Sequence, residues 1–118
     1  MDNSDSIAAL TADIREFARE RDWEQFHDPK SLLLALMGEV GELAELFQWV
    51  PAGDAVEVFS DPARRVRAGE EISDVLIYLL RLGDVLGVDV GSAAVAKLGD
   101  SRLRFPAASV SGKAPDKA

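Results

Sequence analysis

The sequence contains no cysteine and one histidine, His27. Without cysteine the chain has no disulfides, zinc–thiolate sites, iron–sulfur clusters or cysteine nucleophiles. A single histidine also excludes a metal site with two imidazole ligands. The longest apolar runs, residues 32–37 and 75–80, are far shorter than the roughly 20 residues that a transmembrane helix needs. We therefore expect no membrane association.

Basic side chains are also in the minority. The 118 residues include 13 Lys and Arg against 21 Asp and Glu, which gives a net charge of −8. Such a chain is a poor general binder of nucleic acid, because phosphate contacts require clustered basic residues. With 47% hydrophobic and 29% charged residues, the composition is typical of one globular domain. The polar, acidic start MDNSDS lacks a secretory pattern, so we expect a cytoplasmic protein.

Apolar residues recur at helical spacing along most of the chain. Asp-Pro pairs at residues 28–29 and 61–62 indicate helix starts, and Pro51 and Gly87 indicate helix ends. No segment competes strongly as a strand. The prediction is an all-α fold, a four- to five-helix bundle, in one domain over residues 1–106, with 107–118 as a disordered tail. The expected helices span about 7–22, 29–50, 62–86 and 90–104.

Two pairs of acids lie where the helices are most apolar. Glu39 and Glu42 are three residues apart, as are Glu71 and Asp74, so each pair shares one helix face. In an antiparallel hairpin the two pairs can face each other. Desolvation and mutual repulsion would then raise their pKa values, and a bound cation would offset both effects. Carboxylates without His or Cys suit Mg²⁺ or Mn²⁺, and Mg²⁺ commonly bridges to substrate phosphates.

A solvent-facing glutamate stripe is the ordinary explanation of one such pair, but two pairs flanked by apolar runs favour a metal site. The spacing leaves two alternatives open. Glu45 can replace a member of the first pair, and Glu70 can pair with Asp74 at a spacing of four residues.

Aromatic residues accompany these acids. Trp49 follows Glu42 by seven residues, and Tyr78 follows Asp74 by four, so each lies near an acidic pair. Beside a metal–phosphate site they would form a platform for a nucleotide base, although core packing is the common role of such residues. On the last helix a small basic group, Lys97, Arg102 and Arg104, would either neutralise phosphates or face solvent.

Taken together, these motifs resemble the ExxE…ExxD signature of the MazG-like, all-α nucleoside triphosphate pyrophosphohydrolases, and most closely the dCTP pyrophosphatases. The likeness covers roughly residues 7–106. It is carried by RDWEQFH at 21–27, LLLAL at 32–36, GEVGELAELFQW at 38–49 and EISDVLIY at 71–78.

The resemblance implies that the chain cleaves a deoxynucleoside triphosphate between the α and β phosphates, releasing pyrophosphate. It assigns the Mg²⁺ ligands to Glu39, Glu42, Glu71 and Asp74, and so decides both alternatives left by the spacing. It also implies a homo-oligomer, a dimer or a tetramer built as a dimer of dimers, with sites shared between subunits. The residues that it maps to substrate contacts are Trp23, Gln25, His27, Trp49, Tyr78 and Lys97.

Two residues depart from the family pattern. Ser101 stands where Asn is common, which affects the contact expected from the last helix. Arg81, seven residues after Asp74, is also unusual and can pair with Asp74 or Asp84. The acids of the metal site all remain, so we expect activity to be retained.

The predicted function is therefore Mg²⁺-dependent hydrolysis of dCTP or a 5-modified dCTP for cleaning of the nucleotide pool. The four acids would act through a bound water, and Glu45 is a further candidate base. One alternative is a house-cleaning enzyme for another or non-standard nucleoside triphosphate. Another is a non-catalytic helical dimerisation or regulatory module. A ferritin-like di-iron site is disfavoured because it needs Glu-x-x-His motifs.

Overall fold

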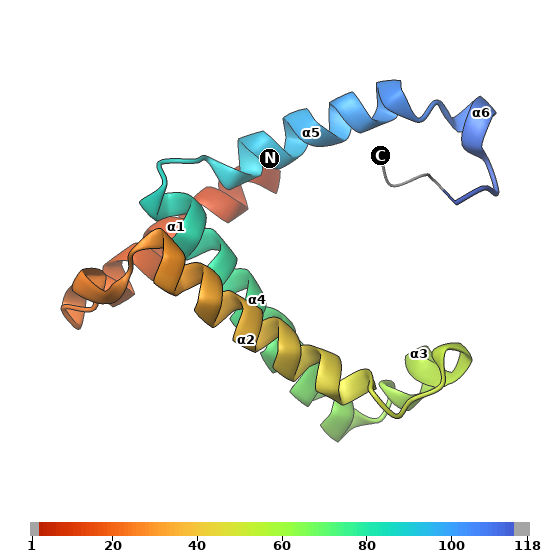
Figure 1. Ribbon diagram of the computed structural model, residues 1–118, viewed down its shortest axis with the longest axis horizontal. Coiled ribbons are helices and arrows are strands. Elements are labelled where there is room, and N and C mark those ends of the chain that lie inside the picture. The colour runs from red at the N-terminus through yellow and green to blue at the C-terminus, as the bar shows by residue number, and fades with distance from the viewer. Residues whose placement is uncertain (1–2, 115–118) are drawn as a thin grey trace.

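The computed structural model describes residues 3–114, and helices make up most of that part of the chain (Figure 1). The all-α prediction is confirmed, since the described residues include no strand. The elements are α1 (Asn3–Glu20), η1 (Glu24–Phe26), α2 (Pro29–Phe47), η2 (Ala52–Asp54), α3 (Ala55–Val58), α4 (Pro62–Val85), α5 (Val90–Arg104) and α6 (Ala107–Val110).

The helix starts follow from local chemistry. Asp28, Asp61 and Asp89 each cap a helix, and their carboxylates accept a hydrogen bond from the backbone N–H three residues on. Proline follows directly after Asp28 and Asp61, at the first helical position, where no N–H is needed. Gly87 follows α4 with φ of 73°, a left-handed conformation that favours glycine.

Two segments differ from the sequence prediction. α2 ends at Phe47, before the expected boundary, and the following loop contains η2 and α3. Helix α6 lies within the segment that we expected to be a disordered tail, so part of that tail has a defined helical turn. The last four residues of the expected tail, 115–118, and the first two residues of the chain lie outside the described residues.

Helices α2 and α4 form a long antiparallel hairpin, which dominates the molecule (Figure 1). α1 packs against α4 at the end of the hairpin where α2 begins, and α5 extends away as an arm that contacts α1. Leu32, Leu80 and Ala18 are almost completely buried and form the core at this junction. Gly83 lies against Val90, and a methyl group there would collide with the valine side chain.

Much of the hairpin's apolar surface remains exposed. Exposed apolar side chains on α2 and α4 include Leu34 at 58% and Met37 at 63%, together with Leu33, Val40, Ile72 and Ile77. An apolar face of this extent favours burial against another protein surface. Among the described helices, none combines the length and hydropathy that crossing a bilayer would require.

Candidate metal site and adjoining cavity

The α2–α4 hairpin brings acids from both motifs together. One carboxylate oxygen each from Glu39, Glu42 and Glu71 lies within 4.8 Å of the other two. Glu39 and Glu42 come from adjacent turns of α2, and Glu71 comes from the facing side of α4. The two acidic motifs therefore face each other across the hairpin, as the sequence predicts.

Two oxygens in this cluster have no partner. Glu39 Oε2 and Glu71 Oε2 are buried, and neither makes a hydrogen bond with any described residue. Glu71 itself is only 7% exposed. A buried carboxylate oxygen without a donor is costly, so the arrangement has the electrostatics of a cation site. A hard divalent cation fits this donor set, which consists of carboxylate oxygens alone.

The environment of the cluster raises the pKa of Glu39. Desolvation is the main cause that raises the pKa of Glu39, and the negative charges of Glu42, Asp74 and Glu71 raise it further. Asp74 is therefore close enough to act electrostatically on Glu39, although it is exposed and lies outside the three-oxygen cluster. Glu45 is exposed and is likewise not one of the three clustered acids.

Arg67 is a neighbour that the sequence analysis did not single out. Its Nε donates to Glu71 Oε1 at 3.2 Å, while the other oxygen of Glu71 has no partner. The spacing of four residues along α4 is the signal that predicts this pair. The ion pair holds one oxygen of Glu71, and the other oxygen stays buried without a donor.

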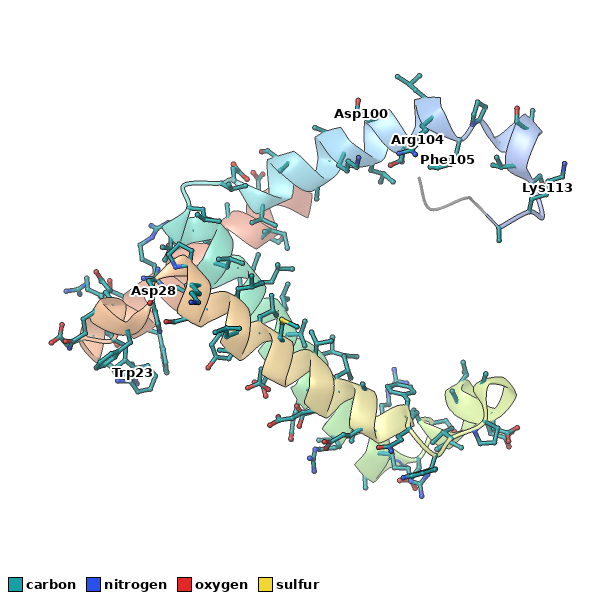
Figure 2. The ribbon with its side chains drawn as sticks, viewed as in Figure 1. Trp23, Asp28, Asp100, Arg104, Phe105 and Lys113 are labelled. Atoms are coloured by element: carbon teal, nitrogen blue, oxygen red, sulfur yellow. The ribbon has the colours of Figure 1, made fainter. Side chains whose placement is uncertain are left out.

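A cavity of about 140 Å³ lies at the end of the hairpin where α2 begins. It combines three of the residues assigned to substrate contacts, Trp23, His27 and Tyr78, with Arg81 and an apolar wall formed by α1, α2 and α4. Figure 2 shows Trp23 beside the start of α2, near Asp28. The Phe17 ring meets the Trp23 ring edge to face, with centroids 5.7 Å apart, and so supports one wall.

The other predicted contacts lie elsewhere in the single chain. Trp49 follows the opposite end of α2, roughly 28 Å of helix from the cavity, and is 86% exposed. It lines a separate groove with Arg64 and Arg67. Lys97 lies on α5, the arm that extends away from the hairpin (Figure 1).

Gln25 is exposed at the link between α1 and α2 and is not among the residues lining the cavity. Its side-chain amide donates to the backbone carbonyl of Asp22 at 2.9 Å and to the Asp22 carboxylate at 3.2 Å. In this structure Gln25 therefore stabilises the turn after α1.

Replacement of Glu71 with Gln should separate a metal site from a merely acidic surface. We expect Mg²⁺ to raise the melting temperature of the wild-type protein, because a ligand that binds only the folded state stabilises it. Glu71→Gln should abolish that increase, and it should also stabilise the metal-free protein by removing like-charge repulsion. Thermal unfolding at fixed protein concentration, with and without Mg²⁺, measures both effects.

Glu70→Gln is the matched control, because Glu70 is the exposed neighbour of Glu71 and carries the same charge. This variant should retain the full response to Mg²⁺. An equal loss in the two variants would show that the response reflects net charge rather than a built site.

Comparison with known proteins places the chain among nucleotide pyrophosphatases. It is 54% identical to dCTP pyrophosphatase 1 of Homo sapiens over 92 residues, which are 78% of this chain and 54% of the human protein. It is 53% identical to dCTP pyrophosphatase 1 of Bos taurus over 91 residues, 77% of this chain and 54% of the bovine protein. The chain thus spans about half the length of these relatives.

A solved structure of a pyrophosphatase has a similar fold. The crystal structure of a pyrophosphatase from Archaeoglobus fulgidus matches with a TM-score of 0.76 and 36% identity, covering 86% of this chain and 93% of the archaeal one. No family model matches the chain. From the identity to these relatives and the shared all-helical fold, we conclude that the chain belongs to the MazG-like, all-α nucleotide pyrophosphohydrolase family that includes the dCTP pyrophosphatases.

Proposed function

We propose that the protein is a Mg²⁺-dependent pyrophosphohydrolase that converts a deoxynucleoside triphosphate and water to the monophosphate and pyrophosphate. The carrying observation is the set of acids facing each other across α2 and α4, with two buried carboxylate oxygens that lack a partner. Such a set needs a cation, and Mg²⁺ in turn favours a phosphorylated ligand. A pure scaffold has no reason to retain this cluster.

Glu39, Glu42, Glu71 and Asp74 are the proposed ligands. A bound divalent cation would supply charge neutralisation for the phosphates and a lowered pKa for the attacking water. The carboxylates orient the site, and Arg67 fixes Glu71 through its 3.2 Å contact. An unligated oxygen of the cluster, or nearby Glu45, would accept the proton from water as phosphorus–oxygen bond formation proceeds. Positioning and electrostatics dominate phosphoryl chemistry, which suits a site built on two rigid helices.

The cavity beside Trp23 and Tyr78 is the proposed place for the base. Aromatic rings stack on any base, so selectivity requires hydrogen bonds as well. The preference for dCTP or a 5-modified dCTP rests on the relatives, which are named dCTP pyrophosphatase 1. Lys97 and Gln25 remain proposed substrate contacts from the resemblance, and no contact among residues 3–114 supports either one.

Two or more copies are proposed to complete the site. Trp49 lies at the wrong end of its own hairpin to reach the cavity, while the exposed apolar face of α2 and α4 is suited to pack against a second hairpin. An antiparallel partner would carry its Trp49 toward the first copy's cavity. We therefore propose a dimer, or a tetramer built as a dimer of dimers, acting on the cytoplasmic nucleotide pool.

The proposed reaction predicts specific products. With dCTP and Mg²⁺ we expect dCMP and pyrophosphate, and with chelator we expect neither, because the acids need the cation to accept a triphosphate. Ion-exchange chromatography of the reaction mixture identifies the products. dCDP and phosphate would contradict the assigned bond.

A panel of dNTPs in the same assay, including dUTP and 5-methyl-dCTP, tests substrate choice. Equal turnover of all of them would contradict the dCTP preference but leave the reaction class standing. The absence of turnover with any nucleotide, together with Mg²⁺-independent folding, would favour a helical dimerisation module instead.

Sharing of the site between copies predicts complementation. Glu71→Gln lacks a metal ligand and Trp49→Ala lacks the proposed partner contact, so each variant alone should be strongly impaired. In a mixed dimer one site combines an intact acid cluster with an intact Trp49 from the other chain. Co-expression in equal amounts should therefore restore about a quarter of the wild-type sites. Activity no greater than the sum of the two variants would show that Trp49 acts only within its own chain.

A further inference from the structure

A series of hydrogen bonds between charged side chains ends at the His27 imidazole. Arg81 Nε donates to His27 Nδ1 at 3.0 Å, and Arg81 Nη1 donates to Asp84 Oδ2 at 3.0 Å. Arg15, on α1, donates to both oxygens of Asp84, from Nε at 2.8 Å and from Nη2 at 2.6 Å. Helices α1 and α4 and the link before α2 therefore meet in one short network. The sequence left Asp74 and Asp84 open as partners of Arg81, and the structure pairs Arg81 with Asp84. The contact with His27, which lies 54 residues away, was not expected.

Arg81 is an unusual residue to bury. Its side chain is only 8% exposed, and a buried guanidinium is costly unless it is paired. Asp84 provides the opposite charge, and the hydrogen bonds from Arg15 are the main cause that holds the pKa of Asp84 below its ordinary range. Arginine does not deprotonate, so its Nε remains a donor at every relevant pH. The network thus fixes a permanent donor against one ring nitrogen of His27.

This hydrogen bond determines which ring nitrogen of His27 carries the proton. Nδ1 must accept the hydrogen bond, so it carries no proton, and in a neutral ring the proton is then on Nε2. Burial is the main cause that lowers the pKa of His27, the charge of Arg81 lowers it further, and Glu24 opposes them. Nε2 makes no hydrogen bond with any described residue, while the ring lines the cavity beside Trp23 and Tyr78.

We propose that Arg81 is a positioning residue that fixes His27 as the Nε2–H tautomer, so that His27 presents a hydrogen-bond donor to the nucleotide in this cavity. The recognition part rests on the proposed function. A donor at Nε2 pairs with an acceptor, such as a ring carbonyl of a pyrimidine, and is mismatched to an exocyclic amino group. His27 therefore reads an acceptor atom, and discrimination of the cytosine amino group falls to another residue.

The first test is nuclear magnetic resonance of the imidazole, and it needs no substrate. Because His27 is the only histidine in the sequence, its two ring ¹⁵N signals are assigned without ambiguity. In the full-length wild-type protein we expect an unprotonated Nδ1 and a protonated Nε2 from a single tautomer. A proton on Nδ1, or shifts averaged between two tautomers, would overturn the proposal even if the protein is an active pyrophosphohydrolase.

The second test uses three variants. Arg81→Leu removes the donor, so the ring signals should move toward the average of two tautomers. Asp84 keeps Arg15 as its partner, so the variant leaves no unpaired carboxylate. Arg81→Lys restores a cationic donor and should recover part of the wild-type tautomer. Arg15→Leu is the matched control, because it removes the other arginine of Asp84 but does not contact His27; it should leave the imidazole signals unchanged. Equal effects of Arg15→Leu and Arg81→Leu would show that the network is only a structural link.

Kinetics with dCTP and Mg²⁺ then test the recognition part. Averaging of the tautomers removes the Nε2 donor from part of the population, so in Arg81→Leu KM should rise by the reciprocal of the Nε2–H fraction that the ring signals report, about twofold for equal populations. The kcat should change little, because the acid cluster is untouched. Arg15→Leu should show the wild-type KM. A lost tautomer with an unchanged KM would overturn the role of His27 in reading the nucleotide.

Discussion

The crowding of carboxylates between α2 and α4 is the interaction on which the rest of this molecule depends. Glu39, Glu42 and Glu71 bring oxygens within 4.8 Å of one another, and two of the cluster's oxygens are buried without a donor. Left alone, this arrangement opposes the packing of the very helices that create it. A divalent cation bound there would convert the repulsion into attraction and link the hairpin. In the proposed function, stability and catalytic competence would therefore be coupled through the same site.

The geometry of the hairpin also supports the proposal that two copies complete the site. Its two ends are separated by the length of α2, so that Trp23, His27 and Tyr78 lie at one end and Trp49 follows the other. The exposed apolar residues along α2 and α4 lie on the surface between these ends. A second copy would bury that surface and supply the missing aromatic side chain in one step. The proposed assembly thus follows from the same geometry as the proposed site.

The sequence predicts those features that are set locally. Asp28-Pro29, Asp61-Pro62 and Gly87 define helix ends because capping and left-handed backbone depend on adjacent residues, and the structure confirms all three. The facing of Glu39 and Glu71 is also predictable, since antiparallel helices with matched acids leave few other arrangements. The structure of the segment after α2 was harder to predict, because α3 is a single turn with no periodic signal. The contact of Arg81 with His27 joins residues from a link and a distant helix, and nothing in their spacing indicates it. The separation of Trp49 from the cavity was not predictable either, because family likeness assigns residues to a site without saying which copy supplies them.

The central claim is that the facing acids of α2 and α4 form the metal site of a nucleotide pyrophosphohydrolase. Crystals of the protein grown with Mn²⁺ and the product dCMP would test it most directly, because anomalous scattering locates Mn²⁺ without reference to any assumed ligand. The account predicts anomalous peaks at coordination distance from carboxylate oxygens of Glu39, Glu42 and Glu71, with Asp74 drawn in as a further ligand. Peaks confined to other acids, or an acid cluster that remains empty at saturating Mn²⁺, would contradict it.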